Sequence, residues 1–338
     1  MTRSYILLFL MSVFACLRIY SECGLTTVCP VPEINLQHTS IFDNIRSEVE
    51  LSLLRAFPSP HSELLLGLTI GIDRLHKVPS FKQALIDTGT IHVVVVSGYN
   101  ISLCFMLLYV LIGKSYSRSK VLLGIVLTFF YALLSGFEPP IVRAWIMGAL
   151  LILSSYYGRG VSGILVLVIS ALSMIVFTPP VIYSLSFILS FSATLSLMLF
   201  TEPLNKLLSK TFLSRLPIYN DLVSTCAAQV LVWPIISYFF GRISIFSPLF
   251  NALTLWTIPI STLLASIWVV VNTLSPNAAK VLVYMIYPFA NTFVLIIQYV
   301  GRNYALLLPV KMSQKSLLIY YLLSLIYLVR KNRDKYDK

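Results

Sequence analysis

The sequence predicts an all-α fold, a polytopic bundle of membrane helices with about ten apolar segments, several of them broken or re-entrant. Of its 338 residues, 57% are hydrophobic and only 11% are charged, whereas a soluble domain usually carries about 25% charged residues. Apolar runs recur at about 20 residues, the length that a helix needs to cross a bilayer. These observations exclude a soluble single-domain protein.

The first apolar run follows Arg3 and covers residues 5–17. A basic residue before an apolar run is typical of a signal peptide or a signal anchor, and we expect an uncleaved anchor over residues 1–20. Cys23 and Cys29 lie beyond it and would pair only if this stretch is outside the cytoplasm. The five cysteines of the chain are too scattered for a disulfide framework or a zinc site.

Residues 21–62 form a polar stretch that we expect to be a short extracytoplasmic segment. In its second half, Ile45, Val49 and Leu53 recur at helical spacing among charged residues, which predicts an amphipathic helix at the membrane surface. The apolar run over residues 64–72 is too short to cross a bilayer of about 30 Å. It is therefore expected to be a half-span, interfacial or re-entrant segment.

A membrane domain is predicted over residues 63–330, followed by a basic cytoplasmic tail over residues 331–338. Several apolar runs of this domain are interrupted by Pro, Gly or Asn. Such breaks are tolerated in a membrane only where protein or a water-filled cavity satisfies the freed backbone groups. Beyond the first span, the expected segments are 91–113, 120–136, 141–157, 161–177, 182–200, 222–240, 249–272, 279–300 and 316–330.

The net charge of +12 arises from 25 basic and 13 acidic residues. One explanation is the accumulation of Lys and Arg in cytoplasmic loops; the other is attraction for a polyanion such as nucleic acid or for anionic lipid. In an alternating arrangement of ten spans, Arg302, Lys311 and Lys315 fall on the outer side, so a late segment is re-entrant or the count is off by one span. The cytoplasmic side receives Lys114, Arg118, Lys120, Arg159, Lys206, Lys210, Arg215 and residues 330–335.

The sequence contains no pattern that supports catalysis. Gly113-Lys114-Ser115 is similar to the end of a phosphate loop, but Leu108 stands where the first glycine of the cradle is needed. The four histidines show no paired metal-ligand spacing. We therefore expect no enzymatic activity, no metal and no cofactor.

Polar groups among apolar residues are more informative, because a charged side chain costs about 2.5–3.5 kcal/mol at the centre of a membrane. His92 precedes a run of four valines that ends in Ser97-Gly98-Tyr99-Asn100. A break at Gly98 would expose polar side chains and backbone within a protein-lined space. The alternative is a capped helix kink with His92 bonded at the membrane interface.

A second stretch places a cation beside a proline pair. Gly136 and Phe137 precede Glu138-Pro139-Pro140, and two prolines fit the start of a helix, where a missing N–H is harmless. Arg143 then lies near the first turn of an apolar span. It either holds a phosphate, or it snorkels to the interface or pairs with Glu138.

A third stretch combines prolines with a polar residue in apolar surroundings. Pro234, Pro248, Asn251 and Pro259 all fall within it, and this pattern is typical of broken helices around a cavity. Kinks that serve only helix packing are the alternative.

Together the three stretches resemble the competence domain of ComEC-type proteins, the inner-membrane DNA channels of bacterial natural transformation. The resemblance runs from about residue 43 to about residue 274. Each motif is weak by itself, whereas their collinear order is specific. The matching positions are residues 89–101 with their G-x-x-H and S-G patterns, then Gly136, Arg143, Ala144, Met147, 158–159, 187–193, 227–229, Pro234, 240–242, Pro248, Asn251, Trp256 and Pro259.

Two departures from the family pattern are visible. Full-length members carry an extracytoplasmic oligonucleotide-binding barrel and often a C-terminal metallo-β-lactamase-like domain. Residues 21–62 are too few for a five-stranded barrel, and no histidine-rich motif follows the last segment. The resemblance therefore implies a reduced form without strand degradation, in which DNA capture outside the membrane depends on a partner or is absent.

The resemblance implies a multi-pass channel that passes single-stranded DNA across the bacterial cytoplasmic membrane. Its expected partners are DNA, membrane lipid, a cytoplasmic DNA translocase motor, an extracytoplasmic DNA receptor and further copies of the chain. A transporter for another anionic solute or lipid on the same architecture is the second hypothesis. A membrane enzyme is the third and the least supported.

A path for single-stranded DNA needs polar or basic groups for phosphates and aromatic faces for unstacked bases. From chemistry and position, and not from the resemblance, we expect Arg143 to contact phosphate and Tyr99 and Phe137 to stack on bases. Structural breaks are expected at Gly98, Gly136, Pro234, Pro248 and Pro259. The predicted path is lined by His92, Ser97, Tyr99, Asn100, Phe137, Arg143 and Asn251.

Overall fold

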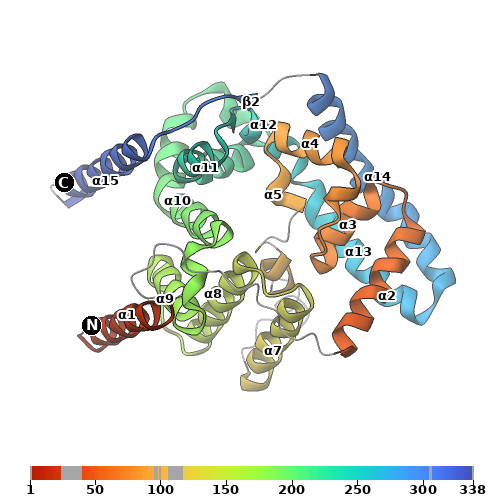
Figure 1. Cartoon of the computed structure of the whole chain (residues 1–338), viewed down its shortest axis with the longest axis horizontal. Coiled ribbons are helices and arrows are strands. Elements are labelled where there is room, and N and C mark those ends of the chain that lie inside the picture. The colour runs from red at the N-terminus through yellow and green to blue at the C-terminus, as the bar shows by residue number, and fades with distance from the viewer. Residues whose placement is uncertain are drawn as a thin grey trace.

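A computed structural model describes residues 2–23, 40–94, 98, 100–105, 117–303 and 307–336 of the chain. These residues are predominantly helical, so the predicted all-α class is confirmed. Figure 1 shows the first and last helices, near the N- and C-termini, on the same side of the view. The accessible surface of 19772 Å² exceeds the roughly 14,000 Å² expected of a compact 38.0 kDa protein, so the helices do not pack into one compact body.

Helices account for nearly all of the regular structure. The first half contains α1 (Thr2–Cys23), α2 (Ser40–Ala56), α3 (His61–Ile70), α4 (Pro79–Thr88), α5 (Ile91–Val94), α7 (Arg118–Leu134), α8 (Pro139–Tyr156) and α9 (Gly163–Phe177). The second half contains α10 (Leu185–Leu208), α11 (Tyr219–Phe240), β1 (Ile243–Ser244), α12 (Ser247–Thr254), α13 (Thr257–Leu274), α14 (Pro276–Asn303), β2 (Leu307–Leu308) and α15 (Gln314–Tyr336). Short 3-10 turns occupy Leu75–Lys77, Pro179–Tyr183 and Phe212–Arg215.

Local residue chemistry determines where several helices begin and end. Helices α4, α8 and α12 carry proline in their first two positions, where the missing N–H has no intrahelical acceptor. Pro259 lies in the first turn of α13 and so begins a helix rather than interrupting one. Gly89 and Gly241 end α4 and α11 with φ values of 71° and 67°, a conformation that glycine adopts without steric cost.

The largest apolar cluster surrounds α3, all ten residues of which are buried. Helices α2, α4, α13 and α14 cover it, and Phe57 meets Trp268 of α13 edge-on at 5.7 Å between ring centroids. Val49 and Leu53 of α2 face this cluster as the amphipathic pattern predicts, whereas Ile45 is exposed. The apolar run over residues 64–72 therefore belongs to a short helix enclosed by protein.

A second group of helices, α1, α7 to α11 and α15, occupies the left and lower part of the view in Figure 1. Helix α1 packs on α9 through Ala15, and α7 and α8 enclose Ala132 and Ile141. Helices α10 and α11 share a cluster with Tyr321 of α15. Each pair is held by apolar contacts along one face, and the opposite faces remain open to the surroundings.

Five helices are long and apolar enough to cross a membrane within the part of the chain that the structure describes: α8, α10, α11, α13 and α14. Only 11–33% of the apolar window of each is buried. Their apolar side chains therefore mostly face outward, where lipid and not water is the compatible solvent. The expected count of about ten segments is not confirmed, because α9 is shorter and segment 91–113 lies partly outside the described residues.

The expected segment over residues 249–272 consists of two helices. Helix α12 ends at Thr254 and α13 begins at Thr257, and the two residues between them, Leu255 and Trp256, keep helical backbone angles. This agrees with the prediction of a broken segment, although neither Asn251 nor Pro259 is itself the break.

Helix α11 differs from expectation, because it continues through Pro234. Proline has no N–H for the carbonyl four residues earlier, which is that of Val230. The Tyr320 hydroxyl of α15 donates to this carbonyl at 2.9 Å, and the Tyr321 hydroxyl donates to that of Leu231 at 2.7 Å. The neighbouring helix thus supplies the one donor that the proline removes and adds a second, and α11 does not have to break.

One turn earlier, α11 receives a second polar insertion. The Ser196 hydroxyl of α10 donates to the carbonyl of Ala227 and accepts from the N–H of Leu231 at 3.2 Å. Ser196 is fully buried. The centre of α11 is therefore fixed to α10 on one side and to α15 on the other by hydrogen bonds to its own backbone.

Replacing Tyr320 and Tyr321 by Phe removes both hydroxyl donors and leaves the carbonyl of Val230, which Pro234 cannot serve, without a partner. We expect the double variant to lose about 1–3 kcal/mol of unfolding free energy, measured by titration with SDS in mixed micelles. Tyr327→Phe, at an exposed position of the same helix, is the matched control and should leave the stability unchanged. Equal stability of the double variant and the control would contradict this account of α11.

Candidate functional site

Arg143 lies at a junction of α8 and α10 with the stretch that contains Gly98. Its Nη1 donates to the carbonyl of Ser190 at 2.8 Å, and its guanidinium carbon lies 5.9 Å from the centroid of the Phe191 ring. A Cβ added to Gly98 would lie 3.2 Å from Nη2 and 2.9 Å from Cβ of Ala144. We call Gly98, Arg143, Ala144, Ser190 and Phe191 the Arg143 junction.

The Arg143 junction unites three motifs that are far apart in the sequence. Gly98 comes from the S-G pattern, Arg143 and Ala144 from the R-A pattern, and Ser190 and Phe191 from the stretch over residues 187–193. The motifs that follow one another along the sequence therefore meet at one place in the fold. The junction, and not any one motif, is the structural unit.

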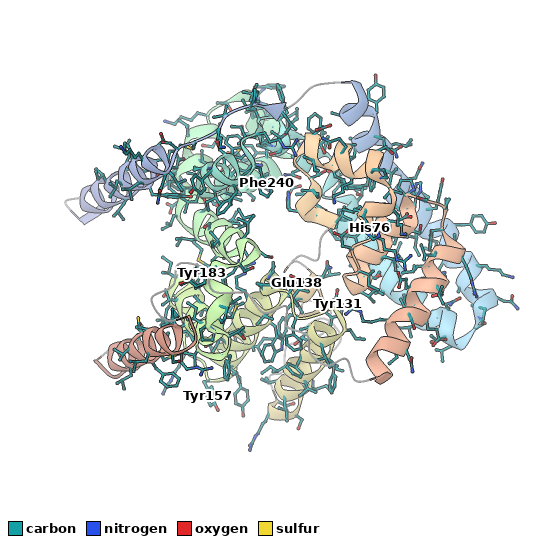
Figure 2. All side chains as sticks on the ribbon, in the orientation of Figure 1. His76, Tyr131, Glu138, Tyr157, Tyr183 and Phe240 are labelled. Carbon is teal, nitrogen blue, oxygen red and sulfur yellow. The ribbon has the colours of Figure 1, made fainter. Side chains whose placement is uncertain are left out.

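The guanidinium of Arg143 keeps donors that the protein does not use. Its Nε is buried and has no hydrogen-bond partner among the described residues. Neither Glu138 nor another carboxylate forms an ion pair with it in the described part of the chain. A guanidinium binds a phosphate or carboxylate through two parallel N–H groups, and Nε and Nη2 form such an edge, which is enclosed beside Gly98 in this structure. Figure 2 shows Glu138, at the Arg143 end of α8, near the centre of the view and Tyr157, after the other end, at the rim.

Asn251 lies in a separate cluster with polar groups of α11 and α12. It is fully buried, and neither atom of its amide has a partner within the described residues. One turn earlier on α12, the Ser247 hydroxyl accepts a hydrogen bond from Nε2 of Gln229, whose Oε1 is buried and likewise unpaired. An unpaired buried polar group costs about 1–3 kcal/mol. The unpartnered amide groups of Asn251 and Gln229 would therefore bind a polar ligand in preference to an apolar one.

The segment that begins at Gly89 packs on this second cluster. A Cβ on Gly89 would come within 3.2 Å of the Ser247 hydroxyl oxygen, and the Ser244 hydroxyl donates to the carbonyl of Asp87 at 3.0 Å. His92 is exposed, and its Nδ1 lies 3.1 Å from the carbonyl of Gly89. We call Gly89, Gln229, Ser244, Ser247 and Asn251 the Asn251 junction.

Asn100 and Phe137 are placed by packing. The Asn100 amide nitrogen donates to the carbonyl of Leu68 in α3 at 2.9 Å, so it connects this stretch to the buried helix. Phe137 has a φ of 52° and packs edge-on against Phe129 of α7 at 5.5 Å. Its partly buried ring packs in an apolar cluster with Trp145, and its stacking on a base stays a prediction.

The structure therefore divides the predicted site residues into two groups. Gly98 and Arg143 meet at one junction, and Asn251 belongs to the other with the segment that leads to His92. Gly136 adopts a φ of 86° next to the guanidinium of Arg46, and Pro248 lies in the first turn of α12. Ser97 and Tyr99 lie outside the described residues.

Sequence reasoning did not assign site roles to Gln229, Ser190 or His61. Gln229 is a polar residue within an apolar run, and this signal was available, whereas Ser190 contributes a backbone carbonyl that no side-chain pattern identifies. His61 donates from Nε2 to the amide oxygen of Asn291 at 3.0 Å and stacks on Tyr287 inside the α3 cluster. In the described part of the chain, no three His, Cys, Asp or Glu side chains gather as a metal site would require.

Outward-facing apolar helices with polar and cationic side chains buried among them define a helical membrane protein. A family model described as competence protein matches residues 68–334. The chain belongs to the competence protein family, and the resemblance to ComEC-type proteins is confirmed.

Three curated relatives are similar over part of their length. An uncharacterized protein of Aquifex aeolicus (strain VF5) is 29% identical over 210 residues, which are 60% of this chain and 50% of the relative. ComE operon protein 3 of Bacillus subtilis (strain 168) is 27% identical over 200 residues, 58% of this chain and 24% of the relative. The uncharacterized protein YcaI of Escherichia coli (strain K12) is 30% identical over 149 residues, 41% of this chain and 20% of the relative.

The matched region thus spans half or less of each of these relatives. No solved structure is similar to the chain.

Gly98→Ala tests the close approach at the Arg143 junction. The added methyl group would lie 2.9 Å from Cβ of Ala144 and 3.0 Å from the carbonyl oxygen of Pro140, which is closer than carbon atoms normally pack. We expect a loss of about 1–3 kcal/mol from overpacking, seen as a lower melting temperature in detergent. Gly160→Ala, with nothing within 4 Å, is the control. A G98A protein as stable as G160A would show that the described approach is wrong.

Proposed function

We propose that the protein is an inner-membrane channel through which single-stranded DNA enters the cytoplasm during natural transformation. The observation that carries the proposal is the meeting of three competence-family motifs at the guanidinium of Arg143, whose buried Nε has no hydrogen-bond partner among the described residues. Phosphate is the ligand that this guanidinium edge suits best. Family membership supports a role in DNA uptake.

The path is proposed to pass both junctions. Arg143 contacts phosphates, while the neutral amides of Asn251 and Gln229 contact nucleotides without holding them by charge. This combination allows entry and release, because a strand held by many cations would not move. Proposed partners are a cytoplasmic motor, since no nucleotide-binding loop was found in the sequence, an extracytoplasmic DNA receptor and further copies of the chain.

The proposed orientation follows the positive-inside rule. Arg159 and the loop with Lys206, Lys210 and Arg215 follow the ends of α8 and α10 and are assigned to the cytoplasm with the C-terminal tail. About ten segments cross or enter the membrane. The loops that begin α8 and follow α11 are then extracytoplasmic.

Cysteine accessibility tests this orientation. In a background without native cysteines, Arg159→Cys should be protected from a membrane-impermeant maleimide added to intact spheroplasts, and Lys311→Cys should be labelled. Both residues are exposed in the structure, so burial in protein does not account for a difference. Labelling of both, or the reverse pattern, would disprove the orientation.

Arg143→Lys tests the phosphate contact. Lysine keeps the charge but cannot form two parallel hydrogen bonds, and a charge-assisted bond contributes about 1.5–3 kcal/mol. We expect DNA uptake to fall at least about tenfold at normal protein level, with transformation frequency and uptake of labelled DNA as the measurements. Arg159→Lys, at the exposed end of the same helix, is the matched control.

Deletion of the gene in a naturally transformable host decides the function itself. If labelled DNA still reaches the cytoplasm at the normal rate in the deletion strain, the protein is not the channel. If uptake is lost but R143K behaves as the wild type, the function stands and the phosphate contact is wrong. Loss of the uptake of a small anionic solute in place of DNA would support the transporter alternative.

A further inference from the structure

The loops after α11 and before α15 carry cations on the side where the positive-inside rule predicts few. Arg242, Lys311 and Lys315 are exposed, and in the described part of the chain none of them forms an ion pair. Cations on the outer side oppose insertion in this orientation. The positive-inside rule explains the cations of the cytoplasmic loops, but it does not explain these three.

The two cationic loops are joined into one surface. Strands β1 and β2 pair antiparallel with Ile243 opposite Leu308 and Ser244 opposite Leu307. Beyond the strands, a Cβ on Gly241 would lie 3.9 Å from Cβ of Lys311. This pairing brings Arg242 and Lys311 together although 68 positions separate them in the sequence.

Hydrogen bonds from one residue of α11 hold the second loop in place. The Ser237 hydroxyl donates to the carbonyl of Val310 at 2.6 Å and accepts from the N–H of Met312 at 3.2 Å. Ser237 is buried. The backbone on both sides of Lys311 is therefore fixed to α11 and does not move independently of it.

Exposed aromatic residues stand on both sides of Arg242 in the sequence. Phe239 and Phe240 at the end of α11 and Phe246 before α12 are 53%, 54% and 51% exposed. Figure 2 shows Phe240 on the inner side of α11, toward the centre of the view. Cationic groups that neutralise phosphates and aromatic faces that stack on bases are the two elements of surfaces that bind single strands.

We infer that Arg242, Lys311 and Lys315, with Phe239, Phe240 and Phe246, form an extracytoplasmic platform that receives single-stranded nucleic acid before it enters the membrane. This inference rests on the proposed function, which it extends by naming the surface where the strand first contacts this chain. We call these six residues the entry platform.

The entry platform is connected to the Asn251 junction. Ser244 of β1 bonds to the carbonyl of Asp87, and the helix after it, α12, carries Ser247 and Asn251. The only carboxylate that these contacts bring near is that of Asp87, and its Oδ1 already accepts from Gln83 at 2.7 Å. A strand seated on the platform is therefore one helix away from the buried amides.

The test uses the full chain in nanodiscs of zwitterionic phosphatidylcholine and a fluorescein-labelled oligothymidylate of 30 nucleotides. We expect Arg242→Gln, Lys311→Gln and Lys315→Gln together to weaken binding at least about tenfold at 0.15 M salt. The slope of log affinity against log salt should decrease by about 2, because each phosphate contact to a single strand contributes about 0.7. Arg159→Gln, Lys210→Gln and Arg215→Gln together are the control, with the same change in charge at exposed positions of the opposite face.

A second variant separates stacking from charge. Phe240→Ala with Phe246→Ala should also weaken binding several-fold, but with the salt slope unchanged. If this variant were misfolded, its salt slope would not match that of the wild type and its melting temperature would be lower.

Three results would overturn the platform. They are the absence of oligonucleotide binding by the wild type, an equal loss in the platform and control variants, and a change only in the retention of phosphatidylglycerol, which would assign the surface to lipid headgroups. The deletion strain judges the proposed function separately. If deletion abolishes DNA uptake while the platform variant binds and takes up DNA normally, the channel stands and the platform is wrong.

Discussion

The structure depends on one constraint: inside an apolar surrounding, each backbone N–H and C=O must find a partner within the protein. Helix α11 shows how this chain meets it, because Pro234 and Ser196 both disturb its ladder and two tyrosines of α15 repair it. These hydrogen bonds come from neighbouring helices, so the packing of α11 depends on contact with both α10 and α15. Kinked or broken helices elsewhere in the chain are acceptable only with comparable support.

The same constraint explains where polar side chains are placed. Arg143 donates to a backbone carbonyl, Asn100 does so as well, and Ser244 bonds to the carbonyl of Asp87. Each of these side chains joins elements that lie far apart in the sequence. Among the buried polar groups that keep atoms without a partner in the described residues are the guanidinium of Arg143 and the amides of Gln229 and Asn251.

The sequence predicted the fold class, the family and the identity of the polar residues, because apolar runs and motif order are local or collinear properties. Pairings were harder to predict. The pairing of Arg143 with Glu138 was considered from their proximity in the chain, yet the guanidinium binds the carbonyl of Ser190, which no side-chain pattern marks. Pro234 was expected to break its helix because proline lacks an N–H. The donors that make a break unnecessary, Tyr320 and Tyr321, are about 90 residues away in the sequence. The apolar packing of Phe137 after the turn at Gly136 was likewise not predicted, because its neighbour Phe129 lies on another helix.

Helix α3 has a consequence for the biogenesis of the protein. All of its residues are buried, and it is covered by α13 and α14, with His61 bonded to Asn291. About 190 residues are synthesised between α3 and α13, which at about 5–20 residues per second takes on the order of 10–40 s. Throughout that interval an apolar helix too short to cross the bilayer lacks two of its native neighbours, α13 and α14. The packing of α3 is therefore completed only after α13 and α14 have been made, well after α3 itself has been translated.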